Sequence, residues 1–277
     1  MSPSTVQTDV YVDSLHIYPI KSISGLSLDR GVVTPRGLED DRRLMLVDER
    51  FRFITGRQHP SLVLVRATRH ADGWTVDAPG QPTLNVTLPD STAPGTEVTV
   101  WRDTVPGRRI CDEIDRWFSD YLGHPCHLVY QHEQDRRPVG PADGTLDDDS
   151  VSFADGYPVL LIGTASLADL NQRLPRAMSM ARFRTNIVAR TDVPFMEDDW
   201  TRVRIGDVVF DVVKRCARCV FTTIDPLSGV RDPGNEPLTT LTRYRRDPDG
   251  GVMFGVNLVP RSPGAISAGD AIVPIAR

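Results

Sequence analysis

Short β-type runs dominate the first hundred residues of the chain. They are rich in Val, Ile, Leu, Thr and aromatic residues, and Gly, Pro or Asp separates one run from the next. Runs of this length between turn-forming residues indicate strands, and many short strands at close spacing are typical of an antiparallel β-barrel or sandwich. The predicted strands are 10–18, 31–34, 43–47, 51–55, 62–69, 74–77 and 97–101.

A helix is predicted to follow these strands. Asp112 is a suitable N-cap residue, and Gly123 is a typical helix terminator. Between them the apolar residues recur with helical spacing, and we expect their side chains to lie in the core. These residues are Ile114, Trp117, Phe118, Tyr121 and Leu122.

The second half of the chain mixes strands with one further helix. An apolar run at 157–162 precedes a helix that is predicted to begin near Thr164. Two Gly-Asp pairs, at 206–207 and 269–270, suit hairpin turns, so residues 265–275 are predicted to close the chain as a hairpin. Further strands are predicted at 187–189 and 203–214.

Residues 133–150 separate the two halves. This stretch is polar, rich in Pro and Gly, and without hydrophobic periodicity, which indicates a long loop or linker. The predicted organisation is therefore an N-terminal domain at 9–132, the linker at 133–150 and a C-terminal domain at 151–277. The fold class is mostly β with a few helices (α+β), and a chain of 277 residues has ample core for it.

The overall charge and the start of the chain limit the classes of function. A formal charge of −5 argues against nucleic acid as the main partner, because such a partner needs a basic face. No apolar run reaches the ~18 residues that a membrane-spanning helix needs. The first ten residues lack the basic and apolar regions of a secretory signal, so we expect a cytoplasmic protein without a membrane partner.

The segment Cys216-Ala217-Arg218-Cys219 lies between two β-type runs and allows three interpretations. A structural zinc site is disfavoured because the usual second pair of ligands is absent nearby. A redox dithiol usually lies at a helix N-terminus, whereas residues 220–224 are β-branched or aromatic and predict a strand. The third interpretation is a turn that offers one thiolate to a larger metal cofactor.

Cationic and small polar residues gather at four places where strands are predicted to begin or end. They are Lys21-Ser22, Arg42-Arg43, Arg184 with Asn186, and Arg218. Neighbouring residues in a strand point to opposite faces, so Arg42 or Arg43 is predicted to face inward, and Arg184 and Asn186 are predicted to share a face. Such a set matches a buried anionic group, which needs charge-assisted donors.

A series of short motifs runs in order from about Tyr11 to the C-terminus. Together they resemble the MOSC-domain proteins that carry an N-terminal MOSC β-barrel, a family similar to the mitochondrial amidoxime-reducing component and its bacterial relatives. The resemblance implies a β-barrel MOSC domain preceded by a β-barrel-like domain. The motifs are Tyr18-Pro-Ile-Lys-Ser22 with Gly25, Gly37-Leu38 with Asp41-Arg42, Thr55-Gly-Arg-Gln-His-Pro60, Phe183-Arg-Thr-Asn186, Ile205-Gly-Asp207, residues 216–226, Phe254-Gly-Val-Asn257 and residues 264–270.

The resemblance implies a molybdenum cofactor, in which a pyranopterin binds the metal and Cys219 adds a protein thiolate. Thiolate is a suitable soft ligand for such a metal. Cys216 is not expected to be a ligand and is predicted to be a small buried thiol. Ala217 replaces a serine of some relatives, so only its backbone can contact the cofactor. The cofactor-binding residues implied are Lys21, Ser22, Arg42, Asp155, Gly156, Tyr157, Arg184, Asn186, Arg218 and Asn257.

The resemblance further implies an oxidoreductase that reduces small N-hydroxylated compounds, such as hydroxylamines and amidoximes, by removing the oxygen atom. Asp225 is a candidate for proton delivery or ligand orientation, and a turn-capping role before Pro226 is the alternative. No cysteine follows Cys219, so we expect electrons from a separate ferredoxin, flavin reductase or haem protein. Two alternatives stay open: a sulfurtransferase with a persulfide on Cys219, and a non-enzymatic carrier of the molybdenum cofactor.

Overall fold

The strands of residues 10–276, which are the part of the chain that the computed structural model describes, form four sheets. The largest has eight strands in the order β18-β14-β15-β16-β12-β13-β1-β2, in which all pairs are antiparallel except β12 and β13. Its strands are β1 (Tyr11–Ile17), β2 (Leu26–Leu28), β12 (Val159–Gly163), β13 (Ile187–Arg190), β14 (Arg202–Ile205), β15 (Val208–Ala217), β16 (Met253–Pro260) and β18 (Ile272–Pro274).

Three smaller sheets complete the β-structure of this part of the chain. One has the order β5-β11-β10-β9, the second β17-β3-β4 and the third β6-β7-β8. The strands are β3 (Arg30–Thr34), β4 (Gly37–Leu38), β5 (Leu44–Val47), β6 (Arg66–His70), β7 (Gly73–Asp77), β8 (Leu84–Thr87), β9 (Thr96–Val100), β10 (Asp103–Arg109), β11 (His127–Tyr130) and β17 (Gly264–Ser267). The predicted fold class, mostly β with a few helices, is confirmed.

Three α-helices and four short 3-10 helices lie between the strands of residues 10–276. The predicted helix at 112–122 is present, with Trp117 and Phe118 buried and Gly123 in the left-handed region that ends it. Its N-cap is Cys111 and not Asp112. No helix in the described residues is long and apolar enough to cross a membrane. The helices are α1 (Asp112–Leu122), α2 (Thr164–Arg173), α3 (Leu238–Thr242), η1 (Pro60–Leu64), η2 (Met180–Phe183), η3 (Met196–Asp199) and η4 (Val220–Thr223).

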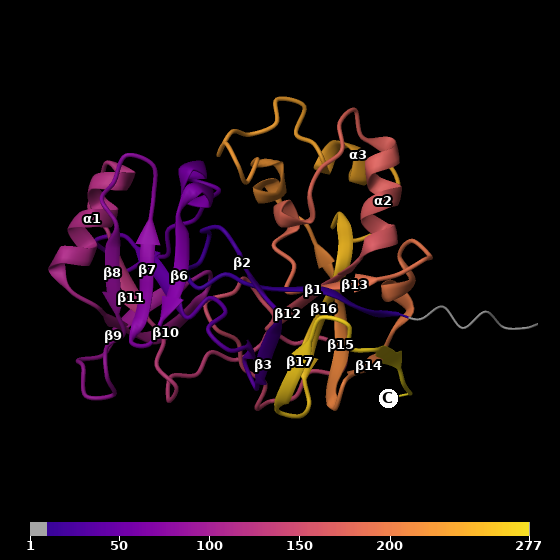
Figure 1. Cartoon of the computed structure of the whole chain (residues 1–277), viewed down its shortest axis with the longest axis horizontal. Helices are drawn as coiled ribbons and strands as arrows, with labels where there is room; N and C mark the ends of the chain where they lie inside the picture. Colours follow the sequence, from indigo (N-terminus) through magenta and orange to yellow (C-terminus); the bar gives the residue numbers. More distant parts are fainter. Residues whose placement is uncertain (1–9, 277) are drawn as a thin grey trace, which may run out of the picture.

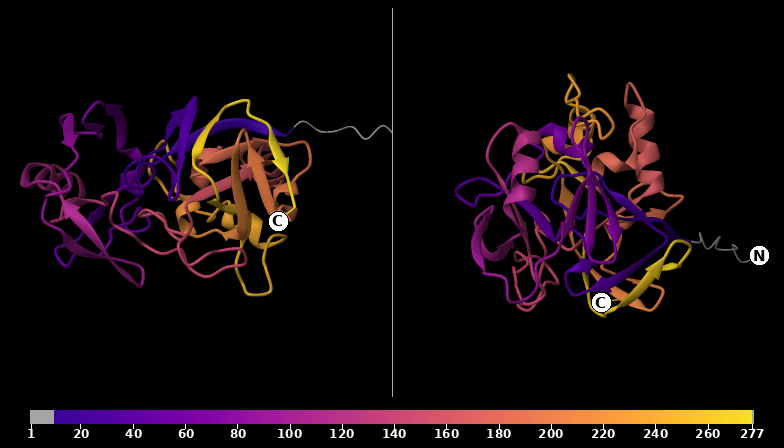
Figure 2. Two further views of the ribbon diagram at one scale, coloured as in Figure 1. Left: turned by 90° about the horizontal axis from the view of Figure 1, so that it is seen from below. Right: turned by 60° about the vertical axis from the view of Figure 1, so that its left-hand side comes forward.

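The molecule has two lobes, which do not coincide with the two halves of the sequence (Figures 1 and 2). β1 pairs with β13, and β3 pairs with β17, so the first strands of the chain complete sheets of the C-terminal lobe. β2 pairs with β1 and β4 pairs with β3, so they belong to the same sheets, and strands β5 to β11 with helix α1 form the N-terminal lobe. The predicted domains, 9–132 and 151–277, therefore share sheets. Their outer limits, residues 9 and 277, lie outside the described residues.

The predicted linker at 133–150 contains no helix or strand, but buried side chains fix it. Asp149 is buried and accepts hydrogen bonds from Arg261, with the shorter N···O distance at 2.5 Å. Arg137 is also buried, and its guanidinium donates to the carbonyl oxygens of Ala154 and Asp155. The segment that leads into residues 154–157 is thereby held in place.

Three local predictions are wrong. Residues 51–55 form only isolated bridges. The strand predicted at 62–69 is present only from Arg66, as β6, because Pro60 suits the first turn of a helix and residues 60–64 form a 3-10 helix. The turn at Gly269 is present, but β17 pairs with β3 and β18 pairs with β14, so the chain does not close as a hairpin. The turn at Gly206 does join a hairpin, β14–β15, as predicted.

Candidate functional site

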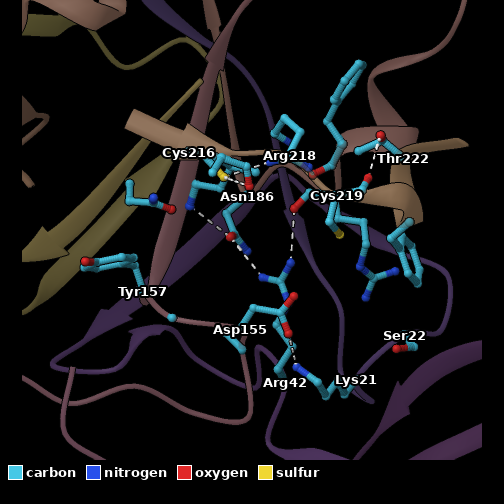
Figure 3. Close-up of a pocket in the computed structure, with 18 of the residues that line it drawn as sticks. Lys21, Ser22, Arg42, Asp155, Tyr157, Asn186, Cys216, Arg218, Cys219 and Thr222 are labelled. Carbon is cyan, nitrogen blue, oxygen red and sulfur yellow. Dashed lines mark hydrogen bonds and ion pairs between the residues drawn. The ribbon is translucent and has the colours of Figure 1, made fainter. Parts of the chain in front are cut away.

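A pocket lies where the two lobes meet and encloses about 150 Å³. Figure 3 shows Ser22 and Tyr157 on opposite sides of it, with Asp155, Asn186 and Cys219 between them. Every predicted site residue except Asp225 contributes to its lining. These residues are Lys21, Ser22, Arg42, Asp155, Gly156, Tyr157, Arg184, Asn186, Arg218, Cys219 and Asn257.

Cys219 lies at the start of η4, and its side chain is exposed in the pocket. The predicted strand at 220–224 is wrong, because Val220–Thr223 forms one 3-10 turn. The hydroxyl of Thr222 donates to the Cys219 carbonyl at 3.0 Å, and the hydroxyl of Thr223 donates to the Val220 carbonyl at 2.8 Å. These local hydrogen bonds favour the turn over the strand that β-branched residues would otherwise prefer.

Cys216 also differs from its prediction as a small buried thiol. It is partly exposed, lines the same pocket, and is a free cysteine like Cys219. Its sulfur accepts a hydrogen bond from Arg218 Nη1 at 3.0 Å, while Arg218 Nη2 donates to the Phe183 carbonyl at 2.6 Å. Cys216 therefore helps to fix the guanidinium of Arg218 in the lining.

Asn186 and Arg42 form the centre of a hydrogen-bond network behind the pocket. The Asn186 side-chain oxygen accepts from Arg42 Nη1 at 3.0 Å and from the Leu160 amide at 3.1 Å. Its amide nitrogen donates to the His16 carbonyl at 3.1 Å, so Asn186 holds Arg42 in place and joins β1 to β12 and β13. Arg42 precedes β5, and Arg43 turns to the opposite side, where it donates to the Gln131 carbonyl.

Arg184 forms one wall of the pocket. It does not lie on a strand with Asn186 as predicted, because it ends η2 with a left-handed backbone and β13 begins after Asn186. The guanidinium carbon lies 4.1 Å from the centroid of the Tyr18 ring and 5.2 Å from that of Phe221. Burial, with the nearby charge of Arg42, lowers the pKa of Arg184 to about 10.

Lys21 and Asp155 form an ion pair at the base of the pocket. Lys21 Nζ lies 2.5 Å from Asp155 Oδ1 and donates to the Phe153 carbonyl at 2.7 Å. Burial lowers the pKa of Lys21 to about 8 despite the carboxylate beside it. Burial alone would raise the pKa of Asp155, but Lys21 and Arg57 outweigh it and hold that pKa well below its usual range.

Three lining residues have positive φ angles that side-chain-bearing residues rarely adopt. Their φ values are 74° at Ser22, 50° at Arg42 and 56° at Arg184. Each such conformation costs on the order of 1 kcal/mol, and persists where the surrounding contacts determine it. Clustering of this strain at one pocket supports a functional interpretation of the site.

Asp225 lies outside the pocket lining. Its Oδ2 accepts from Arg182 Nη2 at 2.8 Å, and its Oδ1 accepts from the amides of Leu227 and Ser228 at 2.9 and 3.0 Å. These contacts are those of a turn-capping carboxylate. The geometry favours this alternative over the predicted part in proton delivery.

Arg57 is a lining residue that the sequence prediction omitted. Its Nη1 atom lies 3.8 Å from the sulfur of Cys219 and 3.3 Å from Asp155 Oδ2. Its guanidinium carbon is 4.6 Å from the centroid of the Trp101 ring. The only signal for it was its place in the motif at 55–60, since an arginine in a polar loop is usually a surface charge. Phe221 and Thr222 also line the pocket and were omitted.

The charge of the lining is strongly positive. Among its described residues Asp155 is the one carboxylate, and the cationic residues are Lys21, Arg42, Arg57, Arg184 and Arg218. Arg184 Nη2 and Arg218 Nε are buried and have no hydrogen-bond partner among the described residues. Unused buried donors are costly, and an anionic ligand with several acceptor atoms would satisfy them.

Comparison with known proteins matches both halves of the chain. The family model of the MOSC N-terminal beta barrel domain matches residues 9–125, and that of the MOSC domain matches residues 148–273. Mitochondrial amidoxime reducing component 2 of Rattus norvegicus is 35% identical, over 94% of this chain and 82% of its own. Mitochondrial amidoxime-reducing component 1 of Homo sapiens is 34% identical, with the same two coverages. The Danio rerio component 1 is 33% identical over 95% and 84%.

Proposed function

Because the chain belongs to the MOSC family, together with the mitochondrial amidoxime-reducing components, we propose that it is a molybdenum-cofactor-dependent oxidoreductase that reduces N-hydroxylated compounds. The observation that carries the proposal is the exposed Cys219 thiol in a pocket lined by five cationic side chains. Thiolate is a soft metal ligand, and guanidinium and ammonium groups bind phosphate and other anionic groups. The pocket thus offers both kinds of contact that this cofactor needs.

The residues present fit the cofactor. Its phosphate is anionic, and Lys21, Arg42 and Arg218 supply positive charge around the pocket. The unpartnered Nε of Arg218 is a donor for one of its acceptor atoms. The pocket volume of about 150 Å³ is smaller than the ~300 Å³ at which ligand sites usually begin, so we expect part of the bound group to stay exposed.

Cys219 would ligate the metal through its sulfur. When bound, the molybdenum cofactor supplies two electrons, which together with two protons convert an N–OH group into N–H and release water. Arg57, close to the Cys219 sulfur, places a positive charge there and stabilises negative charge on it and on an approaching substrate. Asp155 holds Arg57 and Lys21 in position through one carboxylate.

Each turnover consumes two electrons, so we propose a separate electron-donor protein of the ferredoxin, flavin reductase or haem class. The relatives are named as components, which fits an enzyme that works with a redox partner. A small-molecule substrate would reach Cys219 at the exposed mouth of the pocket.

Metal analysis tests the proposal directly. Protein produced with cofactor biosynthesis intact should contain near-stoichiometric molybdenum and reduce hydroxylamines or amidoximes with an artificial electron donor. Cys219→Ala should lose both the molybdenum and the activity, because the protein ligand is gone. Cys216→Ala is the matched control: it should keep most of the metal, since Cys216 only orients Arg218.

Other results would identify the alternative functions. One added sulfur atom on Cys219 after incubation with a sulfur donor, seen by mass spectrometry, would indicate a sulfurtransferase. Full molybdenum content without turnover of any N-hydroxylated compound would indicate a carrier of the cofactor. Protein that stays free of both metal and pterin would contradict the proposal.

A further inference from the structure

Two of the six histidines of the chain lie next to each other in the N-terminal lobe. His59 is the N-cap residue of η1, and His124 follows Gly123, the residue that ends α1. Their Nε2 atoms are 3.2 Å apart, and both residues are partly exposed. Neither lines the pocket that contains Cys219, so the function proposed above does not use this pair.

The geometry of the pair matches two imidazole ligands of one metal ion. Two metal–nitrogen bonds of ~2.0–2.1 Å, at the angles of octahedral or tetrahedral ligands, separate their nitrogen atoms by about 2.9–3.4 Å. The observed 3.2 Å lies in this range. The ring centroids are 4.6 Å apart, which is less than two imidazoles meeting end to end would show at this nitrogen separation. Each Nε2 lone pair is therefore turned off the line that joins the two nitrogens, as shared coordination of one ion requires.

The second ring nitrogen of His124 has the contact expected of a metal-binding histidine. Its Nδ1 atom lies 3.2 Å from the Pro125 carbonyl oxygen, which can only accept a hydrogen bond. Nδ1 therefore carries a proton, and in the neutral ring the free lone pair is on Nε2. Histidines that bind metals usually donate their other ring N–H to such a carbonyl or to a carboxylate.

His59 is available as a neutral ligand at pH 7. Burial, together with the charge of His124, lowers the pKa of the His59 imidazole. Its backbone is also fixed, because the Thr55 carbonyl accepts the amides of Gln58 and His59 at 2.9 and 3.0 Å.

A further hydrogen bond fixes the two elements that carry the histidines. The Tyr121 hydroxyl of α1 donates to the Ser61 carbonyl of η1 at 2.7 Å. The two imidazoles are thus held close together before any ligand arrives, which lowers the cost of binding.

Imidazole nitrogen selects the class of metal. It suits zinc, copper and nickel, whereas magnesium and calcium prefer oxygen ligands. Within residues 10–276 no group of three His, Cys, Asp or Glu side chains could hold a metal ion, so water would complete the coordination of an ion at this pair.

We propose that His59 and His124 together bind one divalent transition-metal ion of the zinc, copper and nickel class through their Nε2 atoms. The ion would join the turn at residues 55–60, which carries Arg57, to the end of α1. The inference does not depend on the function proposed above, because it concerns residues outside the pocket that contains Cys219.

Calorimetric titration of the full chain, without a polyhistidine tag, with nickel chloride tests this inference. The parent protein should show a binding event that His59→Gln and His124→Gln each weaken about tenfold or more, since even the loss of an outer-shell partner of a metal site costs ~10–100-fold. The double variant should bind no more weakly than either single variant, because chelation needs both rings. Ni²⁺ should also raise the melting temperature of the parent more than that of the double variant.

Two controls separate this site from other contacts with the ion. His16→Gln, at a partly exposed histidine that contacts Ser14 and Ser27, should leave the event unchanged. Magnesium chloride should produce no such event. The inference is overturned if Ni²⁺ does not bind, if every binding event survives in the double variant, if His16→Gln weakens binding as much as His124→Gln does, or if magnesium chloride produces the same event. None of these readouts requires molybdenum or turnover.

Discussion

The Nη1 atom of Arg57 lies 3.8 Å from the sulfur of Cys219, although the two residues belong to different lobes. Arg57 also contacts Asp155 at 3.3 Å and packs over the Trp101 ring. The guanidinium is thus fixed from two sides, and its side chain is only 19% exposed. The N-terminal lobe therefore supplies a charged group to the chemistry that we assign to the C-terminal lobe.

Replacing Arg57 should impair the reaction more than the fold. Arg57→Ala should lower kcat/KM for an amidoxime by about tenfold or more, because a charge-assisted contact next to the reacting centre is lost. Arg57→Lys should recover only part of this loss, since a lysine keeps the charge without the planar guanidinium. Arg50→Ala, at an exposed arginine outside the pocket, is the control. An unchanged kcat/KM in Arg57→Ala would remove Arg57 from the mechanism.

Lys21 should make the stability of the cofactor-free protein depend on pH in the alkaline range. Its pKa falls from 10.5 to about 8 on folding, so the unfolded chain binds the proton more tightly, and stability rises as the pH increases from about 8 to 10.5. Lys21→Met should remove this rise, because the titrating group is gone. Urea denaturation across this pH range measures it. Lys214→Met, at the only other lysine of the chain, should leave the rise unchanged.

Glu197 should make stability depend on pH in the acid-to-neutral range. Burial raises the pKa of this carboxyl, which accepts from the Gly163 amide at 3.0 Å and the Ser166 hydroxyl at 2.7 Å. Because this pKa is higher in the folded than in the unfolded state, the stabilisation that Glu197 contributes is fully present below the unfolded-state pKa. It is lost as the pH rises through the folded-state pKa. In thermal melts, the melting temperature of Glu197→Gln should change less with pH than that of the parent protein.

Glu197→Leu separates hydrogen bonding from charge at the same position. It should cost about 1–3 kcal/mol at acidic pH, because the Gly163 amide loses its acceptor, and the cost should shrink as the pH rises and the buried carboxyl of the parent protein ionises. If the Gln and Leu variants behave alike, the carboxyl contributes through its shape and not through its hydrogen bonds.

Gly37 should tolerate no side chain, because it lies against the backbone of Pro158, the residue before β12. Its φ is +99°, and a Cβ atom would meet the Pro158 carbonyl oxygen at 2.6 Å. Gly37→Ala should cost about 2–3 kcal/mol in chemical denaturation, from backbone strain and the clash together. Gly80→Ala isolates the strain, since Gly80 has a φ of +77° and open space around it. Equal costs for the two would show that the contact with Pro158 is not tight.

Patterns in the sequence predicted those parts of the fold that local physics determines. The apolar spacing and Gly123 predicted α1 within one residue, and the β-type run at 10–18 contains β1. The strand predicted after Cys219 failed because the propensity of β-branched residues depends on a partner strand. Residues 220–223 have none in the described part of the chain, and their hydroxyls bond to the preceding carbonyls instead.

The motifs identified most of the residues that line the pocket, but not the contacts that each of them makes. Asn186 was predicted as a cofactor-binding residue and lines the pocket, but the sequence did not indicate that its side chain also hydrogen-bonds Arg42, Leu160 and His16. Arg57 was omitted because nothing local distinguishes it from a surface arginine. Its function follows from contacts between segments far apart in the chain, which periodicity and composition do not encode.

The pairing of β1 with β13 has a consequence for how the protein is made. Val12, Leu15 and Ile17 of β1 are buried in a sheet where β2 flanks β1 on one side, but its partner on the other side, β13, is translated only after the whole N-terminal lobe. At usual elongation rates this delay is on the order of ten seconds. During that time an apolar strand has left the ribosome without its partner, so synthesis, and not the finished fold, is when this chain is most exposed to aggregation and to chaperones.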